Sequence, residues 1–318
     1  MAGAALLTGC AGARHTGRSE SAAAAPLAAA DRSCSRPYSA ASPWNTPIRA
    51  GAPSDPASGA RLDALDSKLT SDPTQYTYPV YRVSSSTPRQ RVAVRGVFSD
   101  VFAGGRRMRI RQQVTIRVPI PPGAAAAAGS DAQIVILNRS SGNEWGAWQL
   151  RRAGGGYSAE NGYHYNTRWS AVPPRSQNGS PFGSRGAGVP YLAGLVRPCE
   201  IARGRIDHAL AFAYDSPSSQ HVYPATKSDG QGRGPSALPE GTRLQLDPSL
   251  SRARIRGWGC RGPCLTAARA LQRYGMYVVD SSGRPKVIFE YEGTAHWNGR
   301  VTARTVSPIP LSAFRVLR

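Results

Sequence analysis

The chain has 318 residues and a formal net charge of +21, and nearly all of its basic residues are arginine. Such a charge invites nucleic-acid binding, because neutralisation of phosphates dominates that affinity. The basic residues are scattered singly, however, and no nucleic-acid motif is present, so we expect no nucleic-acid partner. Affinity for an acidic glycan stays open. No stretch of about 20 apolar residues occurs, which predicts that no segment spans a membrane.

The first ten residues end in Leu6–Cys10 (LLTGC), which resembles a bacterial lipobox, the motif whose cysteine receives diacylglycerol. The apolar stretch before Cys10 is short and lacks a basic region, so residues 1–10 are interpreted as a truncated lipoprotein signal. The alternative is a chance Gly-Cys pair in an Ala-rich leader. Residues 11–37 contain few large apolar groups and are expected to form a disordered tether. These features predict an extracytoplasmic protein, secreted or held to the membrane through its lipid anchor only.

Four cysteines remain when the lipidated Cys10 is set aside, an even number that two disulfides would require. Cys260 and Cys264 flank a Gly-Pro turn that can bring their sulfur atoms together. Cys34 with Cys199 would then tie the amino-terminal arm to the body. A zinc site is the competing interpretation, but one CxxxC motif without a second ligand pair does not support it.

The body, residues 38–318, is expected to form a single domain. Its first predicted helix contains Leu62, Leu65 and Leu69 at helical spacing and stops before Asp72-Pro73. A second helix is predicted over residues 263–274, since Pro263 stands at its start and Gly275 just beyond its end.

Residues from Tyr76 onward change to an alternating pattern that is typical of strands. Strands are predicted over residues 76–80, 91–95, 109–111, 114–118, 134–137, 144–150, 206–214, 276–280 and 286–292. Residues 134–150 are predicted to form one hairpin and residues 276–292 a closing hairpin. Residues 152–190 are rich in Gly, Ser, Asn and Pro and predict a long functional loop. Short strands, Gly/Pro turns and two or so peripheral helices predict an all-β fold of the β-sandwich or jelly-roll kind.

Glu144 is the first candidate for chemistry. Strand alternation places it on one face with Gly146 and Trp148, while Trp145 points to the other face. A carboxylate beside an indole, with a glycine leaving space between them, is typical of a sugar subsite. The alternative is a tryptophan in the core and a glutamate at its rim.

His208 is the second candidate, on a predicted strand whose large residues share its face while Asp207 points away. If those large residues line a cleft, His208 is placed for proton transfer. If they form the core, it is a buried histidine with satisfied hydrogen bonds. The third candidate is residues 161–169, where Tyr163, His164 and Arg168 in a polar loop suit carbohydrate contact. Glu290, on the last strand, is a further acidic candidate.

Several motifs together resemble a group of secreted actinobacterial β-rich proteins. The matching segments are Ser42–Ile48 (SPWNTPI), Ser130–Trp148, Gly194–Leu210 with its IDHAL end, and Gly262–Leu265 (GPCL). The resemblance implies a secreted β-rich domain and carries no activity. Where the group has histidine this chain has Gln133, and the aromatic residue after Glu144 is Trp145. If that histidine is catalytic in the group, this chain has an altered or absent activity.

These observations lead to the hypothesis of a glycoside hydrolase acting on a polysaccharide, which needs two carboxyl groups about 5–10 Å apart across the bond. Glu144 is predicted as one of them, with Glu200, Asp207 and Glu290 as candidate partners in that order, and His208 as a proton donor or orienting group. The side chains expected to contact sugar are Trp145, Trp148, Tyr163, His164, Arg168 and Glu290. A polysaccharide lyase acting on a uronate is one alternative, and a non-catalytic glycan-binding envelope protein is another. The chain is expected to be a monomer, and no cofactor or metal is predicted because no ligand spacing indicates one.

Overall fold

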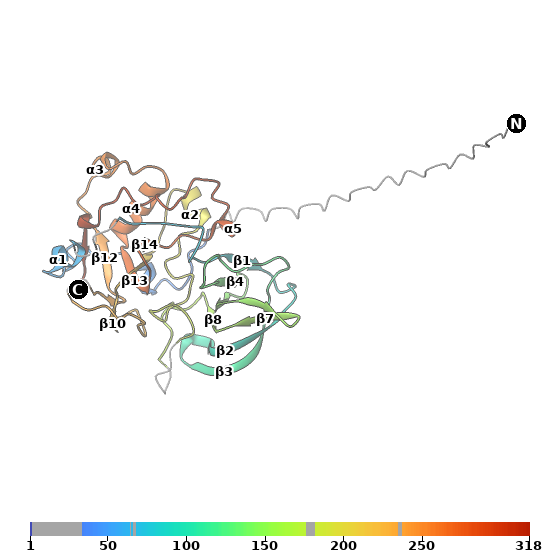
Figure 1. Cartoon of the computed structure of the whole chain (residues 1–318). Helices are drawn as coiled ribbons and strands as arrows, with labels where there is room; N and C mark the ends of the chain where they lie inside the picture. The colour runs from blue at the N-terminus through green and yellow to red at the C-terminus, as the bar shows by residue number, and fades with distance from the viewer. Residues whose placement is uncertain (2–33, 64, 66–67, 176–181, 235–236) are drawn as a thin grey trace. The chain divides into compact units, whose positions relative to one another are not determined.

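The computed structural model describes residue 1 and residues 34–318, except residues 64, 66–67, 176–181 and 235–236. The chain divides into two units, Met1–Arg32 and Ser33–Arg318, and the second contains all the structure considered below (Figure 1). The predicted lipidation site Cys10 and most of the tether lie outside the described residues. Among the described helices, none has the length and apolar character needed to cross a membrane.

The first sheet contains eight strands and curls into a half-barrel. Its strands are β1 (Val80–Val83), β2 (Gln90–Val101), β3 (Met108–Val118), β4 (Ile134–Asn138), β5 (Asn143–Trp148), β6 (Arg151–Ala153), β7 (Gly156–Ala159) and β8 (Asn161–Asn166). Their order is β1-β4-β5-β8-β2-β7-β6, with β3 on the other edge of β2. The sheet is mixed, since β2 runs antiparallel to β3 but parallel to β7 and β8.

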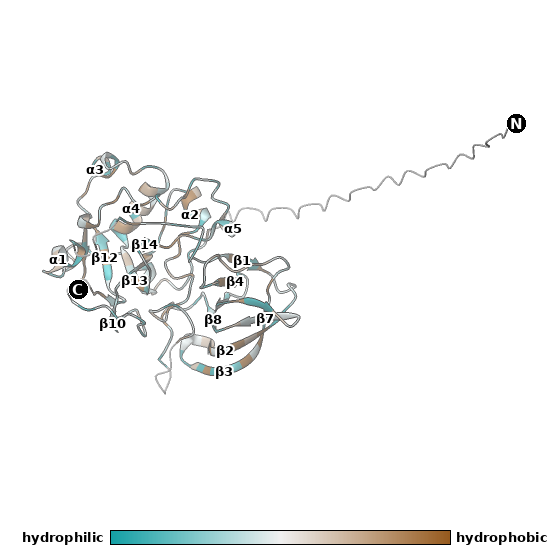
Figure 2. Cartoon of the chain, in the orientation of Figure 1, coloured by the Kyte–Doolittle hydropathy of each residue, from teal (hydrophilic) through white to brown (hydrophobic). Residues whose placement is uncertain are grey.

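The long strand β2 can serve two neighbours because it bends in the middle. Its register against β3 shifts between Val94 and Val97, where the ladder contains a bulge. Gly96 lies at this bend, and a Cβ there would be 2.6 Å from the Glu160 carbonyl oxygen. Before the bend β2 pairs with β7, and after it with β8. Alternation of hydrophobic and hydrophilic residues along β3 is visible in Figure 2.

The second sheet has the order β14-β9-β13-β12-β15. Its strands are β9 (Leu210–Tyr214), β12 (Arg243–Leu246), β13 (Met276–Ser281), β14 (Lys286–Val287) and β15 (Phe314–Val316), and β10 (Ser218–His221) pairs separately with β11 (Pro239–Glu240). The helices are η1 (Pro43–Asn45), α1 (Ser58–Asp63), η2 (Ala103–Gly105), α2 (Pro198–Ala202), α3 (Arg252–Gly257), α4 (Pro263–Arg273), α5 (Glu292–Ala295) and η3 (Leu311–Ala313).

Helix α4 confirms the prediction made from its end signals. Pro263 occupies the first turn, where its missing N–H costs nothing, and Gly275 follows the helix with a φ of 71°. Its apolar face, with Leu265, Ala268 and Leu271, lies in the core cluster of the second sheet. The burial of this face, rather than helix propensity, accounts for most of the stability of so short a helix.

Three clusters of buried apolar side chains fill the body. One covers the second sheet and α4, and another lies on the first sheet around Val92, Phe98 and Ile136. The middle cluster joins the two sheets: it contains Tyr163 from β8 and Ala211 from β9, along with residues 182–195. The two sheets therefore share one continuous interior through this middle cluster.

The structure confirms a mostly β protein, but two mixed sheets replace the predicted β-sandwich. The β4–β5 hairpin is confirmed as an antiparallel pair. The predicted closing hairpin is wrong, because β9 lies between β13 and β14 and pairs with both. Residues 109–118 form one strand rather than two, and residues 152–190 contain β7 and β8 as well as loop. The strand predicted from Ile206 begins only at Leu210. Helix α1 contains Leu62 of the first predicted helix, whereas Leu65 and Leu69 lie outside it.

Both predicted disulfides are present, Cys34–Cys199 and Cys260–Cys264. They are consistent with an extracytoplasmic protein, because such bonds persist in oxidising compartments. The two bridges close loops of very different length, with sequence separations of 165 and 4 residues.

This difference predicts unequal contributions to stability. Replacing Cys34 and Cys199 by alanine should lower the free energy of unfolding by up to about 5 kcal/mol, against about 2 kcal/mol for Cys260 and Cys264, since a longer closed loop restricts the unfolded chain more. Urea unfolding of the two double variants measures this. Equal losses, or a larger loss for the short loop, would contradict it.

Candidate functional site

Glu144, the first predicted catalytic residue, is completely buried on β5. Its carboxylate accepts hydrogen bonds from the hydroxyl groups of Tyr38 (2.7 Å) and Tyr163 (2.5 Å) and from the backbone N–H of Leu192 (3.2 Å). Burial raises the pKa of Glu144, although these hydrogen bonds oppose the rise. The carboxylate therefore holds four segments of the interior together and has no exposed surface for a sugar.

The space beside Gly146 explains why the sequence pattern resembled a sugar subsite. A Cβ at Gly146 would lie 2.1 Å from the Tyr163 ring, so the room left by the glycine is filled by that ring. On the opposite face of β5, Trp145 stacks on His164 with ring centroids 4.9 Å apart. The alternation was predicted correctly, and protein side chains occupy the positions expected for sugar.

Glu200 and His208 form a buried ion-pair network beside the Cys34–Cys199 bridge. Glu200 Oε1 is 2.7 Å from Arg197 Nη2 and 2.9 Å from His208 Nε2. Burial alone would raise the pKa of Glu200, but the charges of Arg197 and His208 outweigh it and hold the pKa well below its usual range. His208 is 3% exposed, and its other ring nitrogen lies 2.8 Å from the Ala209 carbonyl oxygen. This matches the buried-histidine alternative.

Asp207 lies apart from that network and nearer the surface. Its carboxylate pairs with Arg203 (3.1 Å) and Arg205 (2.6 Å), both close in sequence. Glu290 is fully buried, accepts a hydrogen bond from the Thr294 hydroxyl (2.9 Å) and lies 3.7 Å from Arg82. The four predicted acids are thus engaged in separate contacts, three of them in the interior.

The predicted sugar-contacting residues of β8 and its turn are also separated. His164 is half-buried, with Asp100 2.8 Å from Nδ1 and Asn143 3.1 Å from Nε2. The Arg168 guanidinium donates to the Ser140 carbonyl oxygen (2.8 Å). Trp148 donates its indole N–H to Asp131 (3.3 Å). Asp131 lines a pocket that was not predicted from the sequence.

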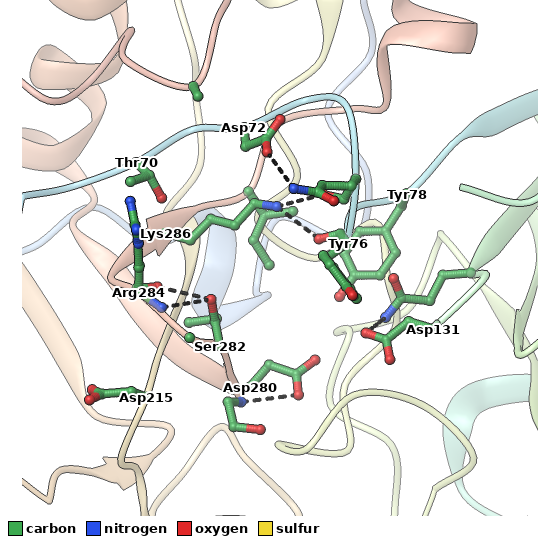
Figure 3. Close-up of a pocket in the computed structure, with 17 residues that line it drawn as sticks. Thr70, Asp72, Tyr76, Tyr78, Asp131, Asp215, Asp280, Ser282, Arg284 and Lys286 are labelled. Atoms are coloured by element: carbon green, nitrogen blue, oxygen red, sulfur yellow. Dashed lines mark hydrogen bonds between the residues drawn. The ribbon is translucent and has the colours of Figure 1, made fainter. Parts of the chain in front are cut away.

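This pocket has a volume of about 840 Å³ and is called the acidic pocket below. Its charged lining residues are Asp72, Asp131, Asp215, Asp280, Arg284 and Lys286, so acids outnumber bases by four to two. They come from the second sheet and the turns beside it, from the segment before β1 and from the turn before β4. Figure 3 shows Asp131 and Asp215 on opposite sides of the pocket.

The pocket carboxylates differ in how they are engaged. Asp215 is exposed and makes no hydrogen bond or ion pair with any residue that the structure describes. Asp131 is half-buried and accepts weak hydrogen bonds from Trp148 and Gln133, both at 3.3 Å. The side-chain oxygen of Gln133 is buried without a partner among the described residues. Asp131 and Asp215 are therefore the pocket acids available for a ligand, whereas the Gln133 oxygen is enclosed in the wall.

Lys286 and Tyr76 also line the acidic pocket. The Lys286 ammonium donates to the carbonyl oxygens of Gln75 (2.8 Å) and Tyr76 (2.9 Å), as Figure 3 shows. Burial lowers the pKa of Lys286 to about 8, although the charges of Asp72 and Asp131 oppose this. Tyr76 has a φ of 48°, which is unusual for a residue with a side chain, and the residue is 47% exposed. A ring held in this way offers a face for stacking.

Three acidic residues next to the pocket form a separate group, which we call the carboxylate cluster: Asp229, Glu240 and Asp280. One oxygen from each lies within 4.8 Å of the others. Burial and the negative charges of Asp280 and Asp229 raise the pKa of Glu240 to about 9. Burial and the charge of Asp229 raise the pKa of Asp280 to about 7. The repulsion between these groups is therefore substantial.

Neither the acidic pocket nor the carboxylate cluster was predicted, because their residues form no local sequence pattern. The pocket acids are spread from residue 72 to residue 280, and each stands in an ordinary turn or strand end. Gln133 was singled out as a departure from the resembled group, and it does line the pocket. Comparison with models of known protein families, with curated proteins and with solved structures finds no match to this chain.

The buried role of Glu144 can be tested through stability. Glu144→Gln should lower the free energy of unfolding by about 1–3 kcal/mol, since an amide cannot accept both tyrosine hydroxyls and the Leu192 N–H. Tyr38→Phe removes one of the same bonds, so the double variant should lose less than the sum of the single losses. Urea unfolding measures all three. Unchanged stability with loss of a catalytic activity would instead support the catalytic role.

Glu290 predicts a pH dependence of stability. Burial, opposed by Arg82 and Thr294, raises its pKa to about 7 from a usual 4.5. The protonated form therefore stabilises the fold by at most about 3 kcal/mol, fully below pH 4.5, and this is lost as the pH rises through 7. Relative to Glu290→Gln, the wild type should lose thermal stability between pH 5 and pH 8. The half-buried Glu292→Gln serves as control, and parallel curves for wild type and Glu290→Gln would contradict the assignment.

Proposed function

We propose that the protein is a carbohydrate-active enzyme of the extracytoplasmic space, which hydrolyses a neutral or amino-sugar polysaccharide in the acidic pocket. The observation that carries this proposal is the pocket itself, about 840 Å³ in volume and lined by four aspartates from separate segments. Its size is that of an ordinary small-ligand site and suits a short stretch of sugar chain. The two disulfides support the location.

Asp131 and Asp215 are the proposed carboxyl pair. Hydrolysis of a glycosidic bond needs one carboxyl group to protonate the leaving oxygen and a second to activate water or attack the sugar. These two residues lie on opposite sides of the pocket in Figure 3, and neither is engaged in an ion pair among the described residues. Tyr76, which is 47% exposed, would stack on a sugar ring.

Charge and acidity weigh against a lyase in this pocket. A uronate would bring a negative charge into a site where acids outnumber bases by four to two. A lyase also needs a side chain that removes the proton next to the uronate carboxyl. Burial raises the pKa of Tyr78, the other tyrosine in the lining, well above its usual value, which makes it a poor base at neutral pH. A neutral or cationic sugar fits better.

A non-catalytic glycan-binding protein is the second candidate. It is favoured by one observation: the pocket contains an amide, Gln133, at the position where the resembled group of proteins has histidine. An amide binds sugar hydroxyl groups but transfers no proton at neutral pH. A binding protein would retain polysaccharide without releasing products.

The test is incubation of the protein with neutral, amino-sugar and uronate polysaccharides, with reducing ends and unsaturated-product absorbance read together. We expect reducing ends from a neutral or amino-sugar polymer. Asp131→Asn and Asp215→Asn should each lower turnover by about 100-fold or more, the usual contribution of an acid or base group. Asp247→Asn, a half-buried turn residue outside the pocket lining, is the matched control and should retain turnover.

Each outcome separates the candidates. Unsaturated product would establish a lyase and overturn the proposal. Retention of a glycan by the folded protein with no product across the panel would favour the binding protein. Full turnover in both pocket variants would place the active site elsewhere.

A further inference from the structure

The carboxylate cluster combines residues from three separate segments. Asp229 lies in the loop after β10, Glu240 ends β11, and Asp280 stands at the irregular end of β13, where the register against β9 shifts. The β10–β11 pairing and the hydrogen bond from Gly241 N–H to the Val278 carbonyl oxygen (2.8 Å) bring these segments together. Their convergence is a product of the fold rather than of sequence proximity.

Glu240 distinguishes this cluster from an ordinary group of surface acids. It is completely buried, and neither of its carboxylate oxygens has a hydrogen-bond partner among the described residues. The nearby Ser228 hydroxyl donates its proton to the Ser218 carbonyl oxygen instead (2.7 Å). Burying a carboxyl group without a hydrogen-bond partner lowers the stability of the fold. A bound ligand would supply the missing partner of Glu240.

The carboxyl oxygens of the cluster lie close to Gly186. A Cβ built on Gly186 would lie 2.3 Å from Asp229 Oδ1 and 2.4 Å from Glu240 Oε1. The backbone N–H of the same glycine donates to Asp280 Oδ1 (3.3 Å). All three acids thus lie against one glycine, whose missing side chain allows their oxygens to come this close.

The basic groups near the cluster do not neutralise it directly. Arg185 is buried and donates to the Tyr78 hydroxyl (3.2 Å) and to the Ala193 carbonyl oxygen (2.6 Å). Lys227 is half-buried and, within the described chain, forms no ion pair with any of the three acids at 4.0 Å or less. Within the described chain the cluster therefore has no basic group in direct contact with its carboxyl oxygens.

We infer that Asp229, Glu240 and Asp280 bind a divalent cation, and that Ca²⁺ is the ion that fits. Carboxylate oxygens without histidine or cysteine form the donor set of hard cations rather than of zinc or copper. The spread of up to 4.8 Å between the oxygens suits ligand distances of about 2.3–2.6 Å around Ca²⁺. Burial, and after it the charges of the neighbouring acids, raises the pKa of Glu240 and of Asp280, and a bound cation would favour their ionised forms.

This inference stands apart from the proposed function, because binding of an ion requires no activity. It has one structural consequence for the acidic pocket, since Asp280 and the four residues after it line that pocket. An ion held by Asp280 would stabilise this wall.

The test is thermal unfolding of the EDTA-treated full chain with and without CaCl₂, MgCl₂ or MnCl₂. We expect Tm to rise by about 5 °C in about 10 mM CaCl₂, as for an extracellular site of modest affinity, and to rise less in MgCl₂. Equilibrium dialysis with metal analysis should give one Ca²⁺ per chain. No Tm shift with any of the three salts, and no bound metal, would overturn the inference.

Three variants locate the site. Glu240→Gln and Asp229→Asn each remove a ligand, and the exposed position of Asp229 makes its variant safe for folding. Gly186→Ala keeps all three acids and places a methyl group between them. Each variant should lose the Ca²⁺-dependent rise in Tm, whereas Asp247→Asn should retain it. A rise that persists in all three variants would show that Ca²⁺ binds elsewhere and would overturn the assignment.

Discussion

The hydrogen-bonded carboxylate of Glu144 is the contact on which the arrangement of the body depends. It ties the amino-terminal arm through Tyr38, the first sheet through Tyr163, and the segment around Leu192 to one buried point. A buried carboxylate is costly unless its oxygens are satisfied, so these three donors must be held in place together. The middle core cluster packs around the same residues and joins the two sheets.

The segment held by this contact also builds the sites. Residues 182–196 run between the sheets, and within them Arg185 donates to Tyr78 in the wall of the acidic pocket. Gly186 follows directly and forms the floor of the carboxylate cluster. Asp280 belongs to both features, since it lines the pocket and faces Gly186. The segment that buries Glu144 therefore also helps to position Asp280 in the wall of the acidic pocket.

Local patterns predicted those elements whose signals lie within one segment. The β4–β5 hairpin and helix α4 were predicted from alternation, a short turn and end signals, and both are confirmed. The closing hairpin failed because β9, far away in the sequence, is buried on all its residues and takes β13 and β14 as its two neighbours. Strand pairing at long range depends on which faces must be buried together, and periodicity carries no information about that.

The sequence by itself determined a mostly β chain, its two disulfide pairs, and the face on which each residue of β5 lies. Only the tertiary structure decided which acids face solvent. Glu144 and Glu200 stand in conspicuous motifs yet are buried with partners, whereas Asp131 and Asp215 stand in plain turns and line a pocket. The physical reason is that the solvent exposure of a side chain depends on how distant segments pack around it. The identity of an acidic residue in the sequence is the same whether it lies in a core or in a cleft.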